Sequence, residues 1–117
     1  MSRWFPLRPT AALAPAEPLW KRAPTRDEDG RLLTDFLMIV PGLRRRSEPE
    51  IRQRLAAIEQ VLTLYGEHVV FADVNLRLNT LWVTVRPVPG ICLELPAAIK
   101  VAVPEALLVG QQRKPNK

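Results

Sequence analysis

Hydrophobic and polar residues alternate along residues 69–87, VVFADVNLRLNTLWVTVRP, in two runs that a polar turn separates. A period of two is typical of strands that bury one face, so we predict strands at about 68–76 and 80–86. The face expected in the core carries Val70, Ala72, Val74, Leu81, Val83 and Val85. The opposite face carries Phe71, Asp73, Asn75, Arg77, Trp82, Thr84 and Arg86. Two aromatic side chains therefore lie among polar groups, and the pattern does not say what covers them.

The residues before these strands predict one more strand. Residues 35–41, DFLMIVP, form a nearly continuous apolar run of strand length that stops at Pro41-Gly42. Such a run is typical of a central strand covered on both faces, which we place at 36–40. Its phase stays open, because either Phe36, Met38 and Val40 or Leu37 and Ile39 would lie beside the aromatics.

A helix is predicted from about 48 to 65. Ser47 and Glu50 have the spacing of a capping box, and Pro49 falls in the first turn, where its missing donor costs little. Apolar residues then recur with spacings of four and three, on one helical face: Ile51, Leu55, Ile58, Leu62 and Tyr65. Gly66 is a suitable helix terminator.

The last elements follow a break at 87–90, PVPG. Because we expect Pro96 to lie only in a first helical turn, we place a second helix at about 93–103, ending at Pro104, and a short strand at 105–110. The order βαββαβ with right-handed crossovers predicts an α+β fold, the ferredoxin-like plait. In that fold a four-stranded antiparallel sheet has two helices on one face, and its first and third strands are central.

The two ends of the chain differ from its middle in composition. Five of the 12 prolines fall in the first 24 residues, so we predict an extended, flexible, basic arm at 1–26. The folded domain would span 27–110, and 111–117 would be a basic, disordered tail. The arm has five basic residues and one acidic, a net charge of +4, and the tail has +3, which leaves −2 for the domain. The net charge of +5 therefore lies on the tails and favours weak, salt-sensitive contacts with polyanions.

Cysteine content and hydropathy bear on location. The single cysteine, Cys92, excludes an internal disulfide and fits a reducing compartment. No apolar run approaches the roughly 18–20 residues of a membrane span, and the run AALA before Pro15 is too short for the core of a signal peptide. We therefore expect a cytoplasmic protein.

The face opposite the predicted helices is the candidate interaction face, made of Phe71, Asp73, Arg77, Trp82, Thr84 and Arg86. Its cover is a second copy of the sheet, the N-terminal arm or a foreign partner, unless Trp82 only shields one arginine stem. A plait with an open aromatic face resembles the RNA-recognition motif. However, the third strand, TLWVTVRP, has one aromatic and no glycine, which argues against nucleic acid as the partner.

The arm at 1–26 carries aromatic residues that could anchor it to a protein surface. The stretches SRWFPLRP and EPLWKRAP each place a tryptophan beside proline and basic residues. Aromatic anchors in a proline-stiffened segment can dock into a groove at low cost in entropy. We predict Trp4, Phe5 and Trp20 as these anchors, with an undirected linker as the alternative.

A second candidate site lies in the loop PGLRRRSEPE, residues 41–50. Arg44, Arg45 and Arg46 precede a helix N-terminus, and together with Ser47 they could hold a small anion. The position of Pro41-Gly42 resembles that in ACT domains, which implies a ligand-sensing regulatory domain. The alternative is a solvated basic loop.

Residues for catalysis are sparse. Cys92 is best explained as a small core residue, and nothing in the spacing brings it to His68, the only histidine. No phosphate loop, dinucleotide fingerprint or metal-binding spacing occurs in the sequence, so we predict no cofactor and no metal. The sequence therefore favours a non-enzymatic interaction or regulatory domain that forms a homodimer or binds a protein partner. An anion sensor and weak nucleic-acid binding through the tails are the alternatives.

Overall fold

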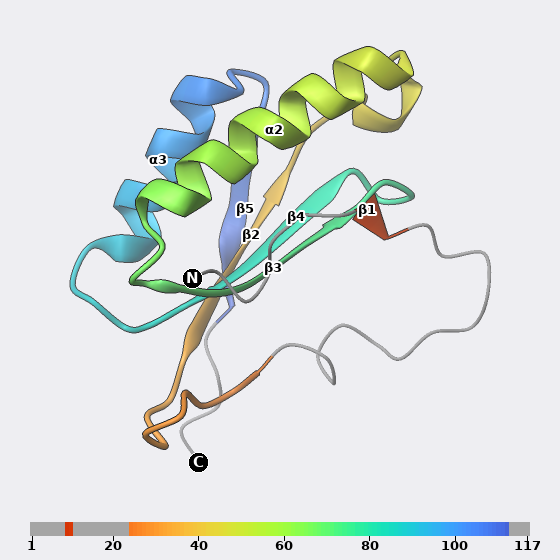
Figure 1. Cartoon of the computed structure of the whole chain (residues 1–117). Coiled ribbons are helices and arrows are strands. Elements are labelled where there is room, and N and C mark those ends of the chain that lie inside the picture. The colour runs from red at the N-terminus through yellow and green to blue at the C-terminus, as the bar shows by residue number, and fades with distance from the viewer. Residues whose placement is uncertain (1–8, 11–23, 113–117) are drawn as a thin grey trace.

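A computed structural model describes residues 9–10 and 24–112 of the chain, and Figure 1 shows how their elements are arranged. The helices are α2 (Glu48–Leu64) and α3 (Ile91–Ala102), and a 3-10 turn, η1, covers Leu43–Arg45. The strands are β1 (Pro9–Thr10), β2 (Thr34–Ile39), β3 (Val69–Asn75), β4 (Thr80–Val85) and β5 (Leu107–Gln112). Neither of these helices is long and apolar enough to cross a membrane.

One sheet joins all five strands, in the order β1-β3-β4-β2-β5. The four predicted strands pair antiparallel, and both helices lie on one face of the sheet (Figure 1). The predicted α+β class with a four-stranded antiparallel sheet and two helices is therefore confirmed. β1 is an addition to it, since Pro9 and Thr10 pair in parallel with Val74 and Asn75 at the outer edge of β3. A two-residue strand has no periodicity that a sequence pattern can reveal.

Helix α2 forms where the capping box predicted it. The Ser47 backbone N–H donates to Glu50 Oε1 at 3.1 Å, and the Glu50 backbone N–H donates to Ser47 Oγ at 3.4 Å. The two residues thus satisfy each other's free donors at the helix start. The predicted apolar stripe buries Leu55, Ile58 and Leu62 against the sheet.

The second helix and the last strand differ from the prediction. Helix α3 begins at Ile91, because Gly90 takes a left-handed φ of 80° and its carbonyl accepts from the amides of Leu93 and Glu94. Pro96 consequently lies one turn further in than expected, and the assumption that it belongs to a first turn is wrong. Its cost is limited, since the missing N–H would have bonded only to Cys92, and its ring is buried. β5 also begins two residues later than predicted, after a turn in which the Ala106 N–H donates to the Val103 carbonyl.

The register of the strands sets the composition of the core. Phe36 pairs with Val83 and Met38 with Leu81, and these four side chains are buried under the helices. The phase that the sequence left open for β2 is thereby decided: Leu37 and Ile39 belong to the opposite face.

One expected core position is displaced by a bulge. A bulge in β3 between Val69 and Phe71 places Val69 opposite Val85 on the helix side. Val70, predicted to lie on the core face, is buried but is not part of the helix-side core. An extra residue in one strand breaks the strict alternation on which the prediction rested.

Candidate functional site

The sheet face opposite the helices brings four of the predicted face residues together. Trp82 on β4 lies between Leu37 on β2 and Asp73 on β3, and in the next row Thr84 pairs with Asp35 and with Phe71. Directly paired residues of neighbouring strands point to the same side of a sheet. Phe71, Asp73, Trp82 and Thr84 therefore share one face, together with Asp35 and Leu37, which were not predicted as members.

This face is not uniformly exposed. We name as the covered band Leu33, Asp35, Asp73 and Thr84, which are all buried; Asp35 and Thr84 are 0% exposed. Leu33 directly precedes β2 and is absent from the helix-side core. Phe71 and Trp82 are half-buried beside the band. An open sheet face would leave such polar side chains to water, so the covered band is shielded from solvent in the folded chain.

The part of the face beside β5 is apolar and more exposed than the covered band. We name as the apolar corner Leu37 and Ile39, which are half-buried, and Leu107, which is 48% exposed and pairs with Ile39. Leu108 and Val109, the next residues of β5, are also exposed, but Leu108 pairs with Met38 and therefore belongs to the helix side. β5 is an edge strand, with a bulge where its pairing passes from Leu37 to Met38. Apolar surface that is continuous over two strands and an edge is typical of interaction sites.

Trp82 lies at the boundary between these two regions. Its indole Nε1–H donates to Thr84 Oγ1 at 3.2 Å, so the ring extends along β4 toward the covered band. This contact satisfies the polar atom of the ring and leaves its apolar surface for packing.

The two predicted face arginines lie at opposite ends of β4. Arg86 follows the strand, donates to the Glu67 carbonyl at 2.9 Å and pairs with Glu28 at 3.3 Å. Arg77 is exposed in the β3–β4 turn, where its carbonyl accepts from Arg44 Nη1 at 3.3 Å. The structure therefore does not bring Arg77 and Arg86 together. Arg86 instead fixes the turn of residues 24–33 to the sheet.

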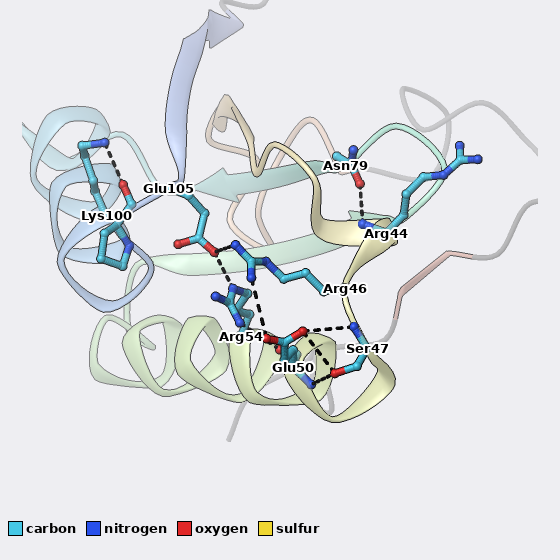
Figure 2. A network of polar contacts seen from close by, with 9 residues as sticks. Arg44, Arg46, Ser47, Glu50, Arg54, Asn79, Lys100 and Glu105 are labelled. Atoms are coloured by element: carbon cyan, nitrogen blue, oxygen red, sulfur yellow. Dashed lines mark hydrogen bonds and ion pairs between the residues drawn. The ribbon is translucent and has the colours of Figure 1, made fainter.

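The predicted anion loop, drawn in Figure 2, is occupied by the chain's own carboxylates. Arg46 pairs with Glu50 at 3.9 Å and with Glu105 at 3.5 Å, and Arg54 Nε–H also donates to Glu105. Glu50 in turn fills the helix N-terminus beside Ser47. Hydrogen bonds from Ser47 lower the pKa of the Glu50 carboxyl, and the bond from Arg54 lowers that of Glu105. Both groups therefore stay ionised to a lower pH than a free glutamate does.

The three arginines of this loop do not converge. The Arg44 amide donates to Asn79 Oδ1 at 2.9 Å, and its guanidinium points away from that of Arg46 (Figure 2). Arg45 is exposed within η1. Of the four predicted ligands, Arg46 and Ser47 already have protein partners in Glu50 and Glu105.

Cys92 and His68 offer no reactive pair in the part of the chain that is described. Burial raises the pKa of the Cys92 thiol, so the thiol stays protonated at neutral pH. His68 precedes β3, where its carbonyl accepts from the Arg86 amide at 2.8 Å. Within residues 24–112 no three His, Cys, Asp or Glu side chains gather as possible metal ligands.

Sequence reasoning missed the residues that divide the face. Leu37, Ile39 and Leu107 were not selected because the phase of β2 and the start of β5 were open, whereas Asp35, an acid beside an apolar run, was a usable signal. The arm anchors Trp4, Phe5 and Trp20 lie outside the described residues, as do residues 113–117 of the predicted tail 111–117, whose first two residues belong to β5. Comparisons of this chain with protein-family models, with curated proteins and with solved structures gave no match. A function for this chain is therefore inferred from its own geometry.

Proposed function

We propose that this chain is a non-enzymatic domain of the ferredoxin-like plait class that works by protein association. The class is supported by the strand order β3-β4-β2-β5, with α2 connecting β2 to β3 and α3 connecting β4 to β5. The fold alone does not imply a function, so the association is argued from the surface.

The apolar corner carries the proposal. Leu37, Ile39 and Leu107 adjoin one another on the sheet face, and the exposed Val109 lies at the bulge of the edge strand beside them. Fully burying one such side chain contributes about 1.5–3 kcal/mol, and the corner would gain only the part that is still exposed. A two-fold dimer would use each of these contacts twice, which favours a second copy of the chain as the partner.

Two features of β5 support a protein chain as the occupant. The strand sequence, LLVGQQ, contains no charged residue and no proline, which are the usual protection of an edge strand. The bulge interrupts its pairing surface, so we place the contact on the side chains of the corner rather than on continuous strand pairing.

The test is the solution mass of the full chain by light scattering over a range of concentrations. We expect a dimer that Leu107→Glu weakens, because the substitution places a charge in the contact. Leu64→Glu is the matched control, since Leu64 is 83% exposed on α2 and should leave the mass unchanged. A monomer at every concentration, or equal effects of the two substitutions, would reject the corner as the site of self-association.

Trp82→Glu tests how far the contact extends. A loss of dimer equal to that of Leu107→Glu would extend the interface over the half-buried aromatics, as the sequence predicted. A dimer unaffected by Trp82→Glu would confine it to the corner.

The alternatives have less support. An anion held by Arg44, Arg45, Arg46 and Ser47 would have to displace the carboxylates of Glu50 and Glu105. Nucleic-acid binding would depend on residues 1–26 and 111–117, most of which lie outside the described residues. A rise of the unfolding midpoint with phosphate, beyond that given by chloride at equal ionic strength, would favour the first alternative.

A further inference from the structure

The direction of β1 sets a constraint on the chain that follows it. β1 is parallel to β3, and β3 and β2 are both antiparallel to β4. β1 and β2 therefore run in the same direction, with β3 and β4 between them. The connection from β1 to β2 must consequently cross the sheet from one end to the other.

The handedness of crossovers selects the face. Helix α2 carries the chain from β2 to β3 on the helix side, which is a move across the sheet toward β1. The β1–β2 connection moves across the sheet in the opposite direction, away from β1 and toward β5. Two right-handed crossovers that move in opposite senses lie on opposite faces. The helix side is also already filled, by α2, α3 and the core beneath them (Figure 1). Both arguments favour the face that carries Trp82 for this connection.

The end points of the connection define a diagonal. β1 ends at Thr10, opposite Asn75, and the chain is described again from residue 24, where the Thr25 carbonyl accepts from the Leu33 amide at 2.9 Å. Crossing three strand spacings and the length of a six-residue strand requires roughly 25 Å. The 13 residues from 11 to 23 can span about 43–47 Å when extended, so the length suffices.

Burial follows this diagonal. Asp73 on β3, Thr84 on β4, and Asp35 and Leu33 at the start of β2 are buried, whereas the apolar corner lies off the line and is partly exposed. We propose that residues 11–23, AALAPAEPLWKRA, are the cover of the covered band. The chemistry is complementary, since the band holds two buried carboxylates and the segment supplies Leu13, Leu19 and Trp20 together with Lys21 and Arg22. This inference goes beyond the proposed association and does not depend on it.

Trp82 provides the probe. In the full chain with Trp4→Phe and Trp20→Phe, Trp82 is the only tryptophan. Adding Leu19→Asp should shift the Trp82 emission to the red and increase its quenching by acrylamide, because the cover is weakened. Leu64→Asp on the same background is the control and should change neither signal. A folded Leu19→Asp protein whose emission and quenching equal those of the background would overturn the proposal.

Proteolysis of the unsubstituted chain covers the case in which Leu19→Asp does not fold. Trypsin should cleave after Lys21 and Arg22 more slowly than after Arg113, since the covered segment must detach before it can be cut. Cleavage at Lys21 and Arg22 as fast as at Arg113 would overturn the proposal. The proposal would also be overturned if the protection of Trp82 from acrylamide disappeared on dilution of the protein, because a second copy of the chain would then supply the cover.

Discussion

The cluster around Glu105 allows the sharpest prediction. Glu105 lies in the turn between α3 and β5 and accepts from Arg54, while Arg46 lies at 3.5 Å, so one carboxylate connects three segments of the chain (Figure 2). We expect Glu105→Gln to lower the free energy of unfolding, because it removes the charge and leaves two guanidinium groups facing a weaker acceptor.

The magnitude follows from the exposure of the cluster. The side chains of Glu105 and Arg54 are 25% and 22% exposed, which places their bond between the surface and the interior. A hydrogen bond to a charged group contributes about 1.5–3 kcal/mol, and an exposed ion pair about 0–1 kcal/mol. Discounted for the remaining solvent, the expected loss is about 1–2 kcal/mol.

Glu48→Gln is the matched control. Glu48 pairs with Arg52 at 3.9 Å, but the two side chains are 80% and 69% exposed, so we expect a loss of about 0.5 kcal/mol or less. Both variants are compared with the unsubstituted chain by urea unfolding at neutral pH and low salt. Equal losses for the two variants would refute the reasoning, since burial would then not govern the strength of the pair.

The same cluster predicts a dependence on pH. The pKa of Glu105 is lowered from 4.5 in the folded chain, chiefly by Arg54, and that of Glu50 is lowered by Ser47. Their contribution is present above the unfolded pKa and is lost as the pH falls through the lowered folded values. The difference between the unsubstituted chain and Glu105→Gln should therefore vanish in acid. A difference that persists below these values would mean that the carboxyl acts through packing rather than charge.

Two further predictions concern single residues. Asn79 holds a positive φ of 58°, accepts from the Arg44 amide through Oδ1 and accepts from the Val40 amide through its carbonyl. We expect Asn79→Ala to lower the free energy of unfolding by about 1–3 kcal/mol in urea unfolding. Asn79→Gly should lower it less, because glycine adopts the positive φ freely although it too lacks the side-chain hydrogen bond. A larger loss for Asn79→Gly than for Asn79→Ala would contradict this. Cys92 should react slowly with a thiol reagent at neutral pH in the folded chain, since burial raises its pKa, and a rate equal to that of the urea-unfolded chain would contradict this.

Local signals in the sequence determined most elements. Helix α2 was predicted to within one residue, because its cap and its apolar stripe involve only neighbouring residues. The strands around the β3–β4 turn followed from alternation in the same way. The starts of α3 and β5 were each displaced by two residues, since Gly90 and the turn at 103–106 take part in hydrogen bonds that composition does not reveal.

Tertiary structure alone decided which part of the sheet face is covered and which part is exposed. The phase of β2, the parallel pairing of β1 and the partners of Arg46 all depend on contacts between residues far apart in the chain. The sequence correctly placed Phe71 and Trp82 on one face, but whether a residue on that face meets water depends on which other segment crosses it. Periodicity reports the side of a strand on which a residue lies, and only the packing of distant segments determines what covers that side.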